Sequence, residues 1–166
     1  MCVESAYYDS CIFLESLNPQ HEEHGACCRL VDVPRISWRV AFSPQLTTAE
    51  ASLREYLEGF EIQCAAHGVD VRRMSPAAAA AAAKEHQELK KKLEQRGFRG
   101  GDWKHLMAAV ASEAGVLVTV DPDYWDPRNK SQPKAKSRLD GVKRSIESSV
   151  GVRIRLPSEI VTACCA

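Results

Sequence analysis

The chain has 166 residues, of which 45% are hydrophobic and 27% charged, and its formal net charge is zero. Such a size and composition are typical of one globular domain, spanning residues 1–166, with enough chain for a sizeable core. The zero net charge excludes a chain-wide attraction to nucleic acid, and the longest apolar run, the alanines at 77–83, is far shorter than the ~20 residues of a membrane span.

The seven cysteines include two adjacent pairs, and no CxxC spacing occurs among them. This arrangement supports neither a zinc knuckle nor a disulfide framework, so we expect reduced thiols in a cytoplasmic protein. The amino-terminal residues carry acids and lack the basic lead and long apolar block of a signal peptide.

The first part of the chain alternates strands with helices. In chain order, the pattern predicts a strand at 3–8, helices at 10–17 and 20–33, a strand at 36–42 and an amphipathic helix at 45–57. The apolar residues of these segments fall at the spacings of half-buried elements. We therefore expect them to pack as layers around one core.

A strand at 68–74 precedes one long helix, which Ser75 begins as N-cap and Gly97 ends. Its first half is almost entirely alanine, the best helix former, and Leu89 and Leu93 are its only sizeable apolar residues. We expect this helical insertion, about 75–98, to pack lightly on the rest of the domain.

The last third continues the alternation. It predicts a helix at 102–114, a strand at 116–120, a basic loop at about 126–144 with a helix near 139–148, a strand at 152–156 and a terminal turn at 157–159. Strands alternating with helices predict an α/β sandwich around a largely parallel sheet.

Two acids lie on apolar faces of predicted helices. Glu50 shares its face with Leu46 and Leu53, and Asp102 shares its face with Leu106. An ionised carboxylate on a buried face needs a cation, a proton or a cleft, since unpaired burial is costly. The alternative for Asp102 is a simple N-cap after the preceding glycines.

Two further acids follow predicted strands. Asp9 comes directly after the strand at 3–8, and Asp121 directly after the strand at 116–120. Residues just past the carboxyl ends of parallel strands line the crevice where ligands bind. Turn formation is the alternative, since Asp121-Pro122-Asp123 is a good turn sequence. If all four acids converge, their oxygens would suit Mg²⁺ or Mn²⁺.

These segments together resemble a known family. The stretches YYDSCIFLE, SPQLTTAEASLREYL, GGDWKHLMAAVASEAG and VLVTVDPDYW look like the four successive acidic motifs of the PIN-domain nucleases, and especially those of VapC-type toxins. The resemblance implies metal ligation by Asp9, Glu50, Asp102 and Asp121, with Asp123 as a fifth acid. It also implies supporting hydroxyls at Ser10 and Thr119 and frequent dimerisation. The fold that it implies is an α/β fold, a PIN-like three-layer α/β/α sandwich with a central, mainly parallel sheet.

A local basic segment follows the last acidic motif. Residues 126–144 carry seven basic side chains against two acids, in a chain that is neutral overall. We predict that RNA phosphates bind Lys104, Arg128, Lys130, Lys134 and Lys136, and that Tyr124 and Trp125 stack on unpaired bases. The alternative is a solvated loop beside aromatic residues that pack in the core.

The leading hypothesis is a metal-dependent endoribonuclease that hydrolyses phosphodiester bonds of single-stranded or structured RNA. Its predicted biological role is that of the toxin in a toxin–antitoxin pair. The partners implied by the resemblance are an RNA substrate, an antitoxin protein and a second copy of the chain. The main alternative is a PIN-like module that binds RNA or protein without cutting. A magnesium phosphohydrolase with a small substrate is disfavoured, because the sequence has no Gly-rich phosphate-binding motif.

Overall fold

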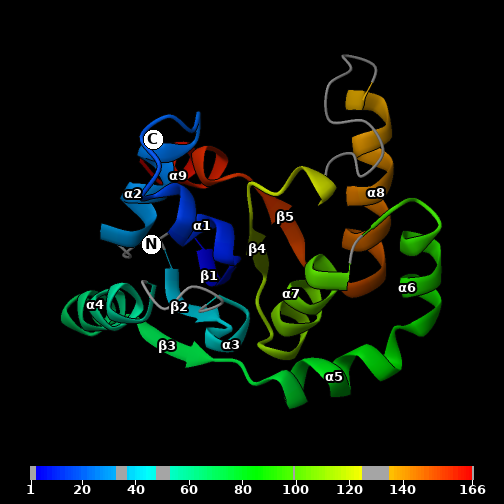
Figure 1. Ribbon diagram of the computed structural model, residues 1–166, viewed down its shortest axis with the longest axis horizontal. Helices are drawn as coiled ribbons and strands as arrows, with labels where there is room; N and C mark the ends of the chain where they lie inside the picture. Colours follow the sequence, from blue (N-terminus) through cyan, green and yellow to red (C-terminus); the bar gives the residue numbers. More distant parts are fainter. Residues whose placement is uncertain (1–2, 33–36, 48–52, 99, 125–134, 166) are drawn as a thin grey trace.

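The computed structural model describes residues 3–32, 37–47, 53–98, 100–124 and 135–165. Its centre is a five-stranded sheet in the order β3-β2-β1-β4-β5, in which every pair of neighbouring strands is parallel (Figure 1). The strands are β1 (Val3–Tyr8), β2 (Ser37–Phe42), β3 (Asp70–Arg73), β4 (Val116–Val118) and β5 (Arg153–Arg155).

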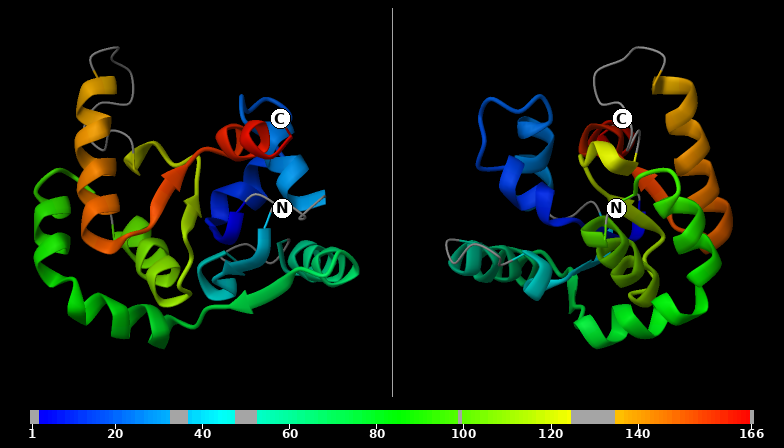
Figure 2. Two further views of the ribbon diagram at one scale, coloured as in Figure 1. Left: turned by 180° about the vertical axis from the view of Figure 1, so that it is seen from behind. Right: turned by 45° about the vertical axis from the view of Figure 1, so that its right-hand side comes forward.

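Helices cover both faces of this sheet. They are α1 (Ser10–Glu15), α2 (His24–Asp32), α3 (Pro44–Thr47), α4 (Leu53–Ala66), α5 (Pro76–Glu85), α6 (Gln87–Glu94), α7 (Gly100–Ala111), α8 (Ala135–Val150) and α9 (Pro157–Cys165), with a short 3₁₀ helix η1 (Pro122–Tyr124). The cores on the two faces are separate: α1, α2, α4 and α9 supply one, and α5 to α8 supply the other. Figure 2 shows the two sets of helices on opposite sides of the strands. The predicted α/β/α sandwich is therefore confirmed.

The alternation of side chains along the strands explains why both faces need helices. Tyr7 points into the core beneath α7, whereas Tyr8 points into the core beneath α1 and α4, and both side chains are almost completely buried. Leu117 and Val118 divide in the same way on β4. A parallel sheet of such strands is stable only when each face is covered.

The strand order places the switch point of the sheet between β1 and β4. The chain proceeds outward from β1 through β2 to β3, and then returns to the other side of β1 to form β4 and β5. The carboxyl ends of β1 and β4 thus lie side by side where the direction of winding reverses. In open parallel sheets this reversal is the point where ligands bind.

The predicted long helix after Ser75 is in fact two helices. Ser75 does form the N-cap, its hydroxyl accepting a hydrogen bond from the Ala78 N–H at 3.2 Å. The helix breaks at His86, whose φ of −119° and ψ of 28° are not helical. The break lets α5 lie along α7 and α6 turn towards α8, where Leu89 and Leu93 are buried (Figure 1). A straight helix could not follow both neighbours.

The alanine-rich helix α5 is a packed part of the fold, so the expectation that it packs lightly is wrong. Ala79 is buried against α7, and Ala78, Ala82 and Ala83 are partly buried beside it. Small side chains let two helix backbones approach closely. The run of alanines therefore serves the contact with α7 as well as helix propensity.

We predict that Leu93→Ala destabilises the protein by about 2–5 kcal/mol, because Leu93 is 1% exposed in the core and its loss would leave a cavity there. The matched control is Lys92→Ala, at the neighbouring exposed position of α6, which should change stability by less than about 0.5 kcal/mol. Urea unfolding of the two variants measures the difference. Equal stability of both would contradict the packing of α6 in the core.

Three other segments differ from their predictions. The helix predicted at 45–57 is described as α3 and as α4, which continues to Ala66, with residues 48–52 outside the described set. The predicted terminal turn is the helix α9, which packs on α2. Helix α8 begins at Ala135, so the second half of the predicted basic loop is helical.

The cysteines do not all behave as expected. Cys11, Cys27, Cys28 and Cys64 are free thiols, in agreement with the prediction. Cys164 is disulfide-bonded, so the expectation of reduced thiols is wrong for this residue. In the described part of the chain, none of the helices combines the length and the apolar character needed to cross a bilayer.

Candidate metal centre

Three carboxylates meet at the carboxyl edge of the sheet. Asp102 lies in the first turn of α7, Asp121 just past β4, and Asp123 in η1, and each offers an oxygen within 4.8 Å of the others. Asp123 is 1% exposed and Asp102 is 8% exposed, so neither is an ordinary surface acid. The cluster lies at the switch point that the strand order creates.

The turn after β4 fixes the two acids it carries. The Asp121 N–H donates to Thr119 Oγ1 at 3.0 Å, and the Asp123 N–H donates to Asp121 Oδ1 at 2.9 Å. The Tyr124 hydroxyl donates to the backbone carbonyl of Asp102 at 2.7 Å and so ties the turn to α7. The Asp-Pro-Asp sequence therefore makes the predicted turn, and that turn brings its acids to Asp102.

Burial and repulsion within the cluster favour the protonated form of Asp102. Burial, followed by hydrogen bonding to and repulsion by Asp121 and Asp123, raises the pKa of Asp102 to about 9. Asp102 Oδ2 is buried and has no hydrogen-bond partner among the described residues. Because α7 begins at Gly100, Asp102 lies inside the helix and is not its N-cap.

These observations fit a divalent cation. Oxygen ligands from several carboxylates suit Mg²⁺ or Mn²⁺, and a cation would remove both the repulsion and the unsatisfied oxygen. Of the four acids expected to converge, Asp102 and Asp121 belong to the cluster, and Glu50 lies outside the described residues. Asp123, treated in the sequence as an optional fifth acid, belongs to the cluster, and Asp9 lies beside it.

Asp9 is buried at the start of α1 and held by two hydroxyls. Its Oδ2 accepts from Thr119 Oγ1 at 2.7 Å, and its Oδ1 accepts from Ser10 Oγ at 3.2 Å. Thr119 Oγ1 also accepts from the Asp121 N–H, so one hydroxyl connects Asp9 to the cluster. The structure thus places Ser10 and Thr119, the two predicted hydroxyls, directly on Asp9.

His105 is a site residue for which the sequence predicted no role. It lies on α7 three residues after Asp102 and is 7% exposed. Its Nε2 is 3.4 Å from Asp9 Oδ1 and 3.3 Å from Ser10 Oγ, and its Nδ1 is 2.9 Å from the Tyr7 hydroxyl. Burial and the charge of Asp9 raise the pKa of Tyr7 well above its ordinary value, so the phenol is neutral.

Several predicted residues lie outside the part of the chain that the structure describes. These are Glu50, Arg128, Lys130, Lys134 and Trp125, together with the side chain of Lys136, whose backbone is in α8. Tyr124 is described and is completely buried against Phe98, so the prediction that it stacks on a base is wrong. It packs in the core, as the alternative proposed.

Lys104 lines a groove between α5 and α7. The groove has a volume of about 430 Å³ and is lined by alanines of α5 together with Trp103, Met107 and Lys90. None of the clustered acids lines it, and Lys104, two residues after Asp102 in α7, points to a different side of the helix from Asp102. Its exposed ammonium group is available to a phosphate at this groove.

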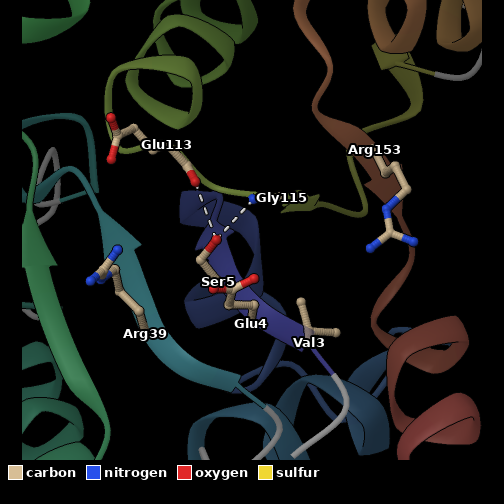
Figure 3. Close-up of a pocket in the computed structure, with 7 residues that line it drawn as sticks. All are labelled: Val3, Glu4, Ser5, Arg39, Glu113, Gly115 and Arg153. Atoms are coloured by element: carbon tan, nitrogen blue, oxygen red, sulfur yellow. Dashed lines mark hydrogen bonds between the residues drawn. The ribbon is translucent and has the colours of Figure 1, made fainter.

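A second hollow, at the opposite edge of the sheet, contains none of these residues. It has a volume of about 360 Å³ and lies at the amino ends of β1 and β4 (Figure 3). Ser5 Oγ there donates to the Glu113 carbonyl at 3.2 Å and accepts from the Gly115 N–H at 3.0 Å. Its charges are mixed, and Arg39 is paired with Asp70. The acidic cluster is the better candidate site.

Fold and site together define an α/β protein with a buried acidic cluster at the switch point of a parallel sheet. No family model and no curated protein matches the chain. Among solved structures, it is similar to the crystal structure of VapBC2 from Rickettsia felis bound to a DNA fragment from their promoter. The match has a TM-score of 0.47 and 15% identity, and covers 92% of this chain and 98% of that one. This similarity is too remote to indicate a function.

Proposed function

We propose that the protein is a divalent-metal-dependent endoribonuclease that hydrolyses phosphodiester bonds in single-stranded or structured RNA. The observation that carries the proposal is the meeting of Asp102, Asp121 and Asp123 at the switch point between β1 and β4, with Asp9 joined to them through Thr119. The resemblance of the four acidic segments to PIN-domain nucleases supports the same reaction and a PIN-like fold.

Each acid has a distinct place in this proposal. Asp102, Asp121 and Asp123 would hold Mg²⁺ or Mn²⁺, and Asp9 and Glu50 would complete the set of acids. When bound, such an ion lowers the pKa of a coordinated water and neutralises charge that develops on the phosphate. The hydroxyls of Thr119 and Ser10 keep the Asp9 carboxylate in a fixed orientation, because each donates to a different oxygen of it.

The central test is cleavage of single-stranded RNA by the purified protein with Mg²⁺ or Mn²⁺, compared with Asp9→Asn and Asp121→Asn. We expect cleavage by the unaltered protein, its loss with EDTA, and its loss in both variants. Undiminished cleavage by both variants would refute the site assignment. Metal binding without cleavage of any RNA would favour the non-cutting RNA- or protein-binding module instead.

Lys104 is the RNA contact that the structure allows to be tested most directly. Replacing Lys104 by Gln should weaken single-stranded RNA binding and lower the slope of log K against log salt by about 0.7, the loss of one phosphate contact. The control is Lys84→Gln on α5, since Lys84 is a second lysine of this region that does not line the groove. Fluorescence anisotropy at several salt concentrations compares them, and identical slopes would remove Lys104 from the RNA path.

The resemblance to VapC-type toxins extends the proposal to partners. On that basis the protein would be the toxin of a toxin–antitoxin pair, held inactive by an antitoxin protein and able to form a homodimer. The basic residues Arg128, Lys130, Lys134 and Lys136 would add phosphate contacts beyond Lys104.

A further inference from the structure

We propose that His105 is a positioning residue that holds the Asp9 carboxylate in place for metal binding. The proposal rests on the proposed function, since it takes Asp9 to be a ligand. His105 touches no atom of the three-acid cluster in the described contacts, but its ring contacts Asp9, Ser10 and Tyr7. Its effect on the metal would therefore pass through Asp9.

The contacts of His105 favour the proton on one ring nitrogen. Asp9 Oδ1 can only accept, and Ser10 donates its hydroxyl proton to it at 3.2 Å. The Ser10 oxygen is then an acceptor for His105 Nε2, which is 3.3 Å away and also faces Asp9 Oδ1 at 3.4 Å. A bare nitrogen there would be repelled by Asp9 Oδ1, and Ser10 could donate to it only by giving up its hydrogen bond to Asp9. We therefore assign the proton to Nε2.

The other ring nitrogen supports the same assignment. With the proton on Nε2, a neutral ring leaves Nδ1 as an acceptor, and the Tyr7 hydroxyl lies 2.9 Å from it as a donor. Each group then donates a hydrogen bond to the next: the Tyr7 hydroxyl donates to His105 Nδ1, and His105 Nε2 donates towards Ser10 and Asp9. All of these side chains are buried or half-buried, so water competes little for these hydrogen bonds.

The position of His105 on α7 gives this network its consequence. His105 and Asp102 are three residues apart on the same helix, and Asp9 follows β1. His105 thus connects the helix that carries one proposed ligand to the strand that carries another. On the far side of Asp9, Thr119 holds Oδ2 and connects it to Asp121. Both carboxylate oxygens of Asp9 are therefore held, Oδ1 by Ser10 and His105 and Oδ2 by Thr119.

The proton position can be measured in the metal-free protein. Long-range ¹H–¹⁵N NMR spectra of the imidazoles should show His105 as the Nε2–H form, and Tyr7→Phe should shift it towards a mixture of both forms. A predominant Nδ1–H form in the unaltered protein would overturn the proposal. This readout needs neither metal nor activity.

Mn²⁺ affinity, measured by electron paramagnetic resonance of the free ion, tests the consequence for the metal. His105→Asn should weaken Mn²⁺ binding by about 10–100-fold, as loss of an outer hydrogen-bond partner of a ligand does. His105→Gln is the conservative variant, because its amide nitrogen can occupy the place of Nε2, and it should restore most of the affinity. Thermal unfolding monitors the fold of both variants.

The outcomes separate the two proposals. If the unaltered protein binds no Mn²⁺, the proposed metal-dependent function fails, whereas the NMR spectra still decide whether His105 donates from Nε2 to Asp9 and Ser10. If the unaltered protein binds Mn²⁺ and both variants bind it equally well, the role of His105 is refuted and the metal centre stands. Equal weakening in Asn and Gln variants that remain folded would also refute it, because a donor at Nε2 would then not matter.

Discussion

Replacing Asp102 by Asn is expected to abolish RNA cleavage and, at the same time, to make the metal-free protein more stable. The loss of a metal ligand should remove several kcal/mol of transition-state stabilisation, or roughly 10³-fold in rate. The gain in stability has a different origin. Asn keeps the shape of the side chain but carries no charge and needs no proton in the buried cluster.

The sign of the stability effect depends on pH. The pKa of Asp102 is about 9 in the folded protein and 3.8 as the ordinary value, so the folded state retains a proton that the unfolded state releases. An amide at this position avoids this cost, so the advantage of Asp102→Asn should be absent near pH 4 and grow as the pH rises towards 9. Allowing for solvent screening, we expect at least about 1 kcal/mol at pH 8.

Urea unfolding at pH 4 and pH 8, with EDTA present, measures this advantage. Asp32→Asn is the matched control, because Asp32 is an exposed acid on α2 and should show neither effect. A destabilised Asp102→Asn at pH 8 would mean that the Asp102 carboxylate is stabilised in the folded protein without metal. The electrostatic description of the cluster would then be wrong.

Metal binding should release the proton of Asp102 and reverse the way in which the free energy of unfolding changes with pH. Without metal, raising the pH from about 4 to 9 should lower the free energy of unfolding, since the raised pKa of Asp102 favours its protonated form only in the folded state. Mn²⁺ binds the ionised carboxylate, so it must displace that proton. The stabilisation by Mn²⁺ should therefore be larger at pH 8 than at pH 5.

At a free Mn²⁺ concentration of about 100 times Kd, stability should rise by about 2.7 kcal/mol, or roughly 5–10 °C in Tm for a domain of this size. Thermal unfolding at pH 5 to 8, with and without Mn²⁺, checks the stabilisation. Calorimetry in buffers of different ionisation enthalpy counts the protons released. Binding with no proton release at pH 7 would show that Asp102 is already ionised, or that it is not a ligand.

The parts of the fold with local sequence signals could be predicted. The apolar runs before Asp9 and Asp121 indicated β1 and β4 correctly, and Ser75-Pro76 indicated the start of α5. The break at His86 had no such signal, because it lies within a run of good helix formers. The break accompanies the packing of α6 on α8, and such a tertiary contact leaves no signal in the neighbouring residues.

The site shows the same division between local and tertiary information. Asp102 and Asp121 could be picked out because each stands next to a clear apolar pattern. The role of His105 could not, since its partner Tyr7 is 98 residues away in the sequence and belongs to another element. The sequence pattern likewise did not predict that Asp123 lies close to Asp102, because the conformation of the η1 turn determines which acids meet.

The positions of the acids along the chain also determine when, during synthesis, the proposed nuclease could first cleave RNA. The Thr119–Asp9 hydrogen bond joins residues 110 positions apart, and Asp102, Asp121 and Asp123 all come late in the chain. A nascent chain that has emerged only as far as α6 carries β1 and Asp9 but none of the three clustered acids. During synthesis, the proposed metal centre therefore cannot assemble until β4 pairs with β1.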